Sequence, residues 1–245
     1  MIQAFSNLER ALQENKPVGV FTDTTILFSA TYHVDQFNDE SEKAFNILAA
    51  HDISAYVSVN VRAEFLENHR RVFIADSLVD FLKDEEKNLS GPLILKLQSH
   101  KVSHRKKVAE GRDSRLDVNQ IKSFRRTLVG FSSNNRNGWE ILCQDYLKPQ
   151  LTPIWRYALN QLDFNFISTR SQDRSPFLDE LPSWERAVEL MANYGIASAD
   201  AMILNMFLCS KLPILLTADL EMAECATQES SGTKQIFVPD SLLHL

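Results

Sequence analysis

The sequence is poor in cysteine, and the few cysteines that it has are widely spaced. Only Cys143, Cys209 and Cys225 occur among 245 residues, and no two of them form a CxxC pair. This spacing argues against a disulfide framework and against a zinc knuckle. Cys209 stands in an apolar run and is expected to be a small buried hydrophobic residue. Such sparse cysteine usage favours a reducing cytoplasm.

Long apolar runs and nucleophile motifs are also missing. No stretch reaches the about 18 apolar residues that a membrane-spanning helix needs, and the polar start of the chain lacks the apolar core of a signal peptide. We therefore expect a cytoplasmic protein with no membrane partner. Neither a GxSxG motif nor a P-loop is present, so chemistry through a side-chain nucleophile is not indicated.

What the sequence does contain is an alternation of short apolar runs with segments of helical periodicity. Hydrophobic residues make up 44% and charged residues 24%, which is typical of a globular protein with a core. The expected strands are residues 18–21, 53–59, 163–168, 213–216 and 235–238, of which 18–21 and 213–216 are expected to be buried. The expected helices include residues 2–14, 41–50, 184–193 and the apolar segment that starts at Ser198, and Asn60 is expected to cap a further helix. This alternation predicts an α/β fold with a parallel sheet.

The middle of the chain differs from both ends. The strand signal fades between residues 76 and 160, and residues 96–126 carry ten Lys and Arg against three Asp and Glu, a net charge of +7. Because the whole chain carries -6, the remainder carries -13. We expect one α/β domain, built from residues 1–75 and 161–245, with a mainly helical, basic insertion at 76–160.

Four acids follow the predicted strands or begin a predicted helix. Asp23 and Asp219 come directly after strands, Glu64 lies one helical turn beyond a strand, and Asp200 lies in the first turn of a helix. Sites in parallel sheets form at the carboxyl ends of strands. Carboxylates that are brought together repel unless a cation joins them, and oxygen ligands select Mg²⁺ or Mn²⁺. Each acid by itself could equally be a turn residue, a helix cap or a solvated side chain, and Glu67 could replace Glu64 as the inward acid.

The segments around these acids are VFTDTTILFSA, VSVNVRAEFLE, AVELMANYGIASADAMIL and LLTADLEM. Together they resemble PIN-domain nucleases, the fold of the toxin ribonucleases in bacterial toxin–antitoxin pairs. The resemblance covers residues 15–70 and 183–240, and the 76–160 insertion has no counterpart in the family's compact members.

The resemblance implies a Rossmann-like PIN fold, with a parallel sheet of about five strands in the order 3-2-1-4-5 and helices on both faces. Asp23, Glu64, Asp200 and Asp219 would be the catalytic, metal-binding acids. Thr25, Thr217 and Glu221 would support them, with Thr217 orienting the site through its hydroxyl. The family also makes a homodimer and an antitoxin-like protein partner possible.

The basic insertion suits a polyanion. At about 100° per residue, one uninterrupted helix would gather six cations on one side, unless Gly111 breaks it: Lys101, Arg105, Lys122, Arg126, Arg112 and Arg115. This stripe predicts contact with RNA, or with DNA. The alternative is a solvated face, or a clamp against the acidic remainder of the chain.

The histidines, the large aromatic residues and a polar loop of the insertion are not expected to form a functional site. His100 and His104 are expected to face solvent rather than to bind zinc, because no acid triad accompanies them. Trp139, Trp155 and Tyr157 are expected to pack in a core rather than to stack on bases. Residues 130–138 are expected to form an exposed, mobile loop.

Three functions compete at this point. The first is an Mg²⁺- or Mn²⁺-dependent endoribonuclease that hydrolyses phosphodiester bonds with a metal-activated water. The second is a PIN-fold module that binds RNA or protein without cutting. The third is a phosphatase of the haloacid dehalogenase type, which is disfavoured because Thr25 stands where that family needs a second Asp.

Overall fold

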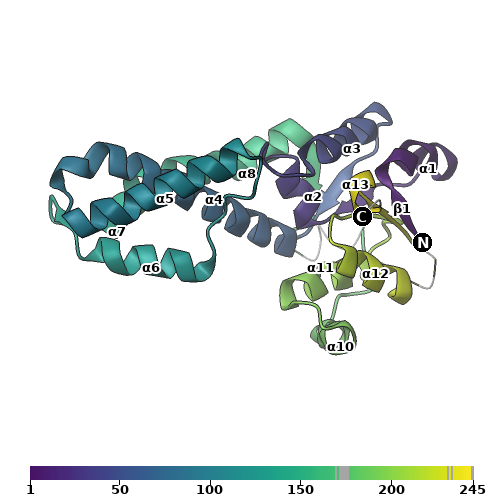
Figure 1. Ribbon diagram of the computed structural model, residues 1–245. Helices are drawn as coiled ribbons and strands as arrows, with labels where there is room; N and C mark the ends of the chain where they lie inside the picture. The colour runs from purple at the N-terminus through teal and green to yellow at the C-terminus, as the bar shows by residue number, and fades with distance from the viewer. Residues whose placement is uncertain (169, 171–176, 231, 233, 244–245) are drawn as a thin grey trace. The chain divides into compact units, whose positions relative to one another are not determined.

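The computed structural model describes residues 1–168, 170, 177–230, 232 and 234–243. Its contacts divide the chain into two compact units (Figure 1). The α/β unit comprises residues 1–33, 37–65 and 158–245, and the helical unit comprises residues 34–36 and 66–157. The boundaries fall inside two helices, at 65/66 and 157/158, whereas the sequence suggested 75/76 and 160/161.

The α/β unit is built on a parallel sheet of six described strands. They are β1 (Ile2–Ala4), β2 (Val20–Thr22), β3 (Ala55–Val57), β6 (Phe164–Phe166), β7 (Ile214–Leu216) and β8 (Gln235–Val238), in the order β1-β8-β7-β2-β3-β6. All five pairings are parallel, and β2, in the middle, pairs Phe21 with Tyr56 of β3 and with Leu215 of β7. Every residue of the central strands β2 and β7 is buried, which explains the unbroken apolar runs at these positions in the sequence.

The strand order differs from the predicted order 3-2-1-4-5 because there is an additional edge strand. Residues 2–14 were expected to be one helix, but Ile2–Ala4 pairs with β8, and only the 3₁₀ turn η1 (Phe5–Asn7) and α1 (Leu8–Asn15) are helical. Pairing satisfies the backbone groups that β8 would otherwise leave exposed at the sheet edge. The apolar spacing of residues 2–12 could not separate these two outcomes.

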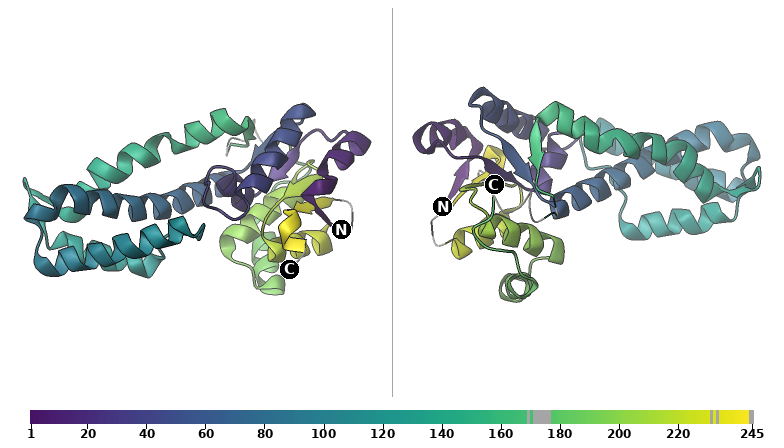
Figure 2. Two further views of the ribbon diagram at one scale, coloured as in Figure 1. Left: turned by 45° about the horizontal axis from the view of Figure 1, so that its top comes forward. Right: turned by 180° about the vertical axis from the view of Figure 1, so that it is seen from behind.

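Helices cover both faces of this sheet (Figure 2). Helices α2 (Thr24–Ser29) and α3 (Asn38–Ala50) lead from β2 towards β3, and α10 (Trp184–Tyr194), α11 (Ser198–Cys209) and α12 (Leu220–Glu229) flank β7 in sequence. Ser183 caps α10, and Gly195 ends it in the left-handed conformation, φ 71°. Helix α11 is buried on almost all sides, as its composition predicted, and Cys209 is 1% exposed. The short helix α13 (Asp240–Leu243) follows β8.

Two long helices run from the α/β unit into the helical unit. These are α4 (Val59–Glu85) and α8 (Lys148–Leu162). Ser58, and not Asn60 as predicted, occupies the N-terminal end of α4, where its Oγ accepts from the amide of Val61 at 3.4 Å. Between the two helices lie η2 (Glu86–Asn88), α5 (Gly91–Ala109), α6 (Val118–Val129), α7 (Gly138–Ile141) and the π-helical turn η3 (Leu142–Leu147).

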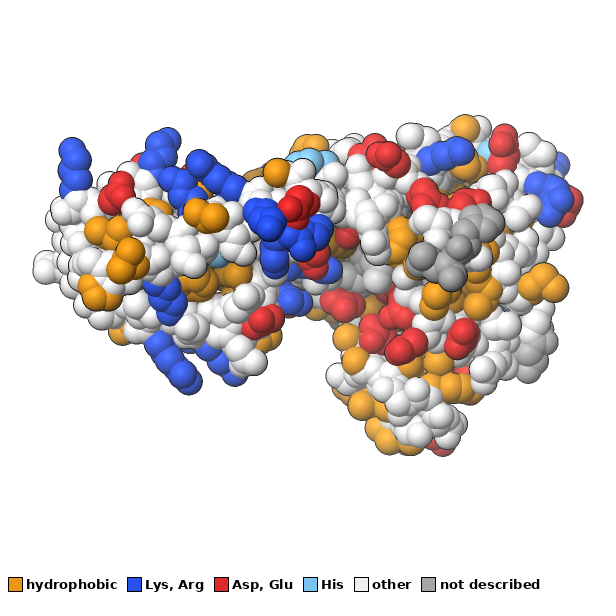
Figure 3. Space-filling view, in the orientation of Figure 1, with side chains coloured by type: hydrophobic (Ala, Val, Ile, Leu, Met, Phe, Trp, Pro, Cys, Tyr) orange, Lys and Arg blue, Asp and Glu red, His pale blue; other side chains and the backbone are white. Residues whose placement is uncertain are grey.

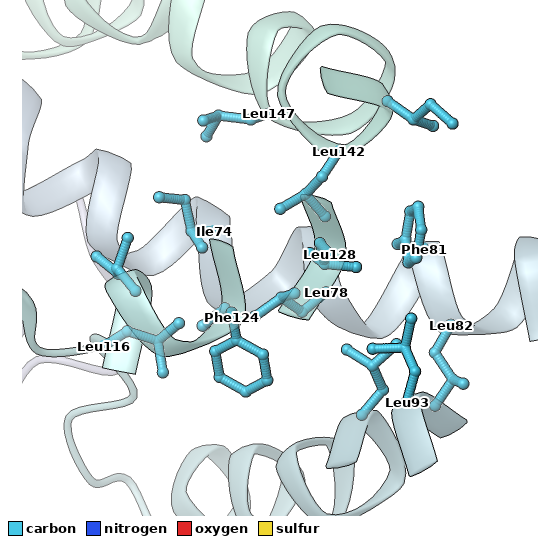
Figure 4. Close-up of a cluster of buried hydrophobic side chains, with 14 of the residues drawn as sticks. Ile74, Leu78, Phe81, Leu82, Leu93, Leu116, Phe124, Leu128, Leu142 and Leu147 are labelled. Atoms are coloured by element: carbon cyan, nitrogen blue, oxygen red, sulfur yellow. The ribbon is translucent and has the colours of Figure 1, made fainter. Parts of the chain in front are cut away.

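The helical unit has a hydrophobic core of its own (Figure 4). Its largest fully buried side chain is Phe81 on α4, whose ring meets those of Phe131 and Tyr146 edge-on at 6.0 Å. Residues 132–137, expected to be a mobile loop, form a small antiparallel hairpin of β4 (Ser132–Ser133) and β5 (Arg136–Asn137). Its turn residues Asn134 and Asn135 both have positive φ, as a tight two-residue hairpin turn requires.

Across the part of the chain that the structure describes, no helix is long and apolar enough to cross a membrane.

Candidate active site

Asp23 lies at the carboxyl end of the central strand β2. Its amide donates to the carbonyl of Leu216 in β7 at 3.0 Å, which fixes the backbone between two strands. Its side chain caps α2, because Oδ1 accepts from the amide of Thr24 at 2.6 Å and Oδ2 accepts from that of Thr25 at 3.4 Å. The side chain is 1% exposed. Asp23 therefore combines the expected strand-end position with the alternative role of a helix cap.

Two threonine hydroxyls hold the same carboxylate. Thr25 Oγ1 and Thr217 Oγ1 donate to Oδ2 of Asp23 at 2.8 and 3.0 Å. Each hydroxyl also accepts a backbone amide, that of Ala218 for Thr25 and that of Asp219 for Thr217. Because each amide must donate, each hydroxyl hydrogen points at Asp23. This arrangement favours the ionised form of Asp23 and ties the ends of β2 and β7 together.

Thr24, which the sequence did not single out, connects two of the predicted acids. Its hydroxyl donates to Oε2 of Glu64 at 2.9 Å, while its amide donates to Asp23. Thr24 is 1% exposed, so little water competes for these contacts. The sequence signal was the unbroken Asp-Thr-Thr, in which one threonine serves each acid. Glu67 instead pairs with Arg70 at 2.6 Å, so Glu64 is the acid that faces the site.

Asp219 and Asp200 complete the acidic group. Asp219 follows β7 and caps α12, with Oδ1 accepting from the amide of Met222 at 3.0 Å. Asp200 lies in the first turn of α11 and is partly exposed. Glu221 is exposed, and its charge acts on Asp200. The structure therefore brings all four predicted acids, and Glu221, into one electrostatic neighbourhood.

The pKa values of Asp200 and Asp23 are raised at this site. Burial, first, and then the charges of Glu64, Asp23, Asp219 and Glu221 raise the pKa of Asp200 to about 7. Burial raises the pKa of Asp23 to about 6; the hydrogen bond from Thr25 opposes this rise, and the charge of Glu64 adds to it. Carboxylates whose ionisation is this unfavourable are typical of sites that bind a cation or move a proton.

Within the ranges that the structure describes, no base neutralises these acids. Among the described residues, no ion pair includes Asp23, Glu64, Asp200 or Asp219. Figure 3 shows acidic side chains gathered over α11 and α12 of the α/β unit. The side-chain atoms of these four acids that could coordinate a metal ion are all carboxylate oxygens, a ligand set that suits Mg²⁺ or Mn²⁺. However, no group of three or more His, Cys, Asp or Glu side chains within the described ranges is already arranged to hold a metal ion.

The basic insertion does not form one stripe. Helix α5 ends at Ala109, Gly111 takes a φ of 63°, and α6 starts at Val118, so the six predicted cations divide between two helices and the loop that joins them. In that loop Arg112 pairs with Glu110, and Arg115 pairs with Asp113 at 2.8 Å. Figure 3 shows Lys and Arg side chains projecting from several sides of the helical unit.

The histidines of the insertion were wrongly expected to face solvent. His104 is 8% exposed and contacts Asp76 at 2.8 Å, and the half-buried His100 contacts the carbonyl of Ala75 at 2.9 Å. They join α5 to α4, because both partners lie on α4. Among the aromatic residues, Trp155 is buried and Trp139 packs against the helical core, but Tyr157 is 55% exposed.

Comparisons of the chain with protein-family models, with curated proteins and with solved structures return no match.

Proposed function

We propose that this protein is a metal-dependent nuclease of the PIN type, an endoribonuclease that hydrolyses phosphodiester bonds. The observation that carries the proposal is a group of oriented carboxylates at the end of β2, where Thr24 holds both Asp23 and Glu64. Burial and the charges of four neighbouring carboxylates raise the pKa of Asp200 to about 7 in the same group. Such a concentration of negative charge, with no paired base among the described residues, is stable at neutral pH when a divalent cation joins it.

The residues have separate roles in this proposal. Asp23, held by Thr25 and Thr217, offers a carboxylate whose orientation is set before any ligand arrives. Glu64 is oriented by Thr24. Asp200 and Asp219 close the site from α11 and α12, and the partly exposed Asp200 releases its proton as a cation binds.

An Mg²⁺ or Mn²⁺ ion, when bound, supplies neutralisation of phosphate charge and acidification of an attacking water. RNA is preferred as the substrate on the strength of the sequence resemblance. The chain itself provides the orientation of the acids and the exclusion of water around Asp23, which is 1% exposed. No side-chain nucleophile is required.

The direct test is cleavage of single-stranded RNA with Mn²⁺, with Mg²⁺ and with EDTA. We expect cleavage only with metal, and we expect Asp23→Asn and Asp200→Asn to reduce the rate by about a hundredfold or more, in the range that loss of a key electrostatic group produces. Asp39→Asn is the matched control, because Asp39 is exposed on α3 of the same unit. Cleavage that survives EDTA, or that Asp23→Asn leaves unchanged, would contradict the proposal.

One observation favours a second candidate, a nuclease-inactive module of the same fold that binds RNA or protein. The described residues contain no preassembled group of three metal ligands. A module that only binds RNA or protein would not need such a group. Titration with Mn²⁺ separates the two candidates. Binding that depends on Asp23 and Asp200 supports the nuclease, whereas intact RNA binding with no Mn²⁺ binding supports the module.

A further inference from the structure

Helix α6 of the helical unit carries an uncompensated positive surface. Lys122, Arg125 and Arg126 are exposed, and residues 118–129 contain no Asp or Glu. The opposite side of the helix is used in the core, where Ile121, Phe124 and Leu128 are buried. At about 100° per residue, Lys122 and Arg126 point away from that core, and Arg125 lies on the flank.

A fourth cation lies beside these three. Lys96 on α5 reaches across to α6, where its Nζ donates to the carbonyl of Ser123 at 3.1 Å and to the hydroxyls of Ser123 and Thr127 at 2.9 and 2.6 Å. These acceptors are uncharged, so the positive charge of Lys96 remains. We call Lys96, Lys122, Arg125 and Arg126 the α6 patch.

Some of the other basic side chains of the insertion have acidic partners, whereas Lys101 and Arg105 on α5 form no ion pair among the described residues. Arg112 pairs with Glu110, Arg115 with Asp113 and Arg136 with Asp145. Within the described residues, no member of the α6 patch forms an ion pair. The nearest acid in sequence, Asp117, is used as the N-cap of α6, where it accepts from the amide of Gln120 at 2.8 Å.

We propose that the α6 patch binds the phosphate backbone of RNA. Arginine presents a planar fork that matches phosphate oxygens, and cations one helical turn apart can contact neighbouring phosphates. The exposed side of α6 offers no large aromatic anchor for a protein interface. Its largest apolar side chains are used in the core rather than left for a membrane, while the smaller Val118 and Val129 at its two ends are 51% exposed. Because residues outside 96–126 carry a net charge of -13, association with RNA needs such a surface.

This inference deepens the proposed function but is tested separately from it, because binding is measured without cleavage. Anisotropy of a labelled single-stranded RNA is recorded in EDTA, with the full chain. We expect Lys122→Glu/Arg126→Glu to weaken binding by about tenfold or more and to reduce the salt dependence of the affinity, since phosphate contacts are lost. If the first variant does not fold, Lys122→Gln/Arg126→Gln, whose new side chains are uncharged, should also weaken RNA binding.

The matched control is Lys148→Glu/Arg156→Glu, which changes the net charge equally on the exposed side of α8. It should leave the affinity within about twofold, because distant exposed charges are screened. Equal loss in both variants, or no loss in the α6 variant, overturns the inference, as does tighter binding to anionic vesicles than to RNA. Binding of duplex DNA and of heparin is measured in the same way, to show whether the patch prefers RNA or accepts any polyanion. Binding of these polyanions as tight as that of RNA also overturns the assignment to RNA. Asp23→Asn should retain the binding even if it abolishes cleavage.

Discussion

At the scale of single residues, Thr24 is the most informative position. It lies between Asp23 at the end of β2 and Glu64 on the long helix α4, with its amide on Asp23 and its hydroxyl on Glu64. The contact with Glu64 could not be predicted from local pattern, because the two residues are 40 positions apart in the sequence. Residues that orient ligands in this way influence affinity without contacting the bound ion.

We expect Thr24→Val to lower Mn²⁺ affinity by about tenfold or more, which is typical of the loss of an outer-shell partner. Valine keeps the shape but removes the donor to Glu64. Thr24→Ser keeps the hydroxyl and should restore most of the affinity. Calorimetric titration of each variant with Mn²⁺ measures the difference. If the serine variant is as weak as the valine variant, the hydroxyl is not the cause.

The raised pKa of Asp200 predicts a pH dependence of stability in the metal-free protein. The folded state holds this proton more tightly than the unfolded state, with a pKa of about 7 against 3.8. The free energy of unfolding therefore falls as pH rises from the unfolded to the folded pKa, and the penalty is complete above about pH 7. Asp200→Asn removes the penalty.

In EDTA, Asp200→Asn should thus be more stable than the wild type at about pH 8, and this advantage should shrink towards about pH 4. Urea unfolding followed by circular dichroism at both pH values measures it. Saturating Mn²⁺ should reverse the order at about pH 8, because only the wild type gains the full binding energy. An advantage of the variant that is the same at both pH values would show that Asp200 is not ionising in the site.

At the scale of elements, a single lysine contacts three carbonyls at and just beyond the end of α11. Lys234, just before β8, donates from Nζ to the carbonyls of Phe207, Ser210 and Leu212 at 3.0, 2.6 and 3.0 Å, and it lies 4.6 Å from the centre of the Phe207 ring. The carbonyl of Phe207 also accepts from the amide and the hydroxyl of Ser210, and the carbonyls of Ser210 and Leu212 lie just beyond the end of the helix. Because α11 carries Asp200 at its other end, this contact also supports the site.

We expect Lys234→Met to lower the free energy of unfolding by about 2 kcal/mol, since buried carbonyls lose a charged donor. Lys211→Met is the control, because Lys211 is exposed in the same connection. Thermal unfolding of both variants in EDTA measures the effect. Equal stability of the two would mean that water replaces the lysine at no cost.

At the scale of the whole molecule, the chain builds two separate cores. The helical unit buries Phe81 among Phe131 and Tyr146, whereas the α/β unit buries its strands between two helical layers. Phe81→Ala should lower the stability of the helical unit by about 3–5 kcal/mol, the usual cost of removing a buried phenylalanine.

Trp139 and Trp155 lie in the helical unit, and Trp184 of the α/β unit is already 69% exposed in the folded state, so the change in tryptophan fluorescence during urea unfolding reports mainly on the helical unit. Leu95→Ala is the comparison, because Leu95 is 68% exposed on α5 of the same unit; it should change stability by less than about 0.5 kcal/mol. A fluorescence transition that Phe81→Ala leaves in place would contradict a dedicated core.

Local patterns in the sequence were sufficient for the α/β class, five of the six described strands, the helical insertion and the candidate acids at the strand ends. These features depend on periodicity and on residue type over short windows. Other features were decided only by contacts between distant segments: the edge strand Ile2–Ala4 beside β8, the choice of Glu64 over Glu67, the coupling through Thr24, and the division of the basic segment between α5 and α6. The physical reason is that a strand needs a partner strand and a carboxylate needs a donor or a counter-charge. Such partners lie far away along the chain, where periodicity carries no information.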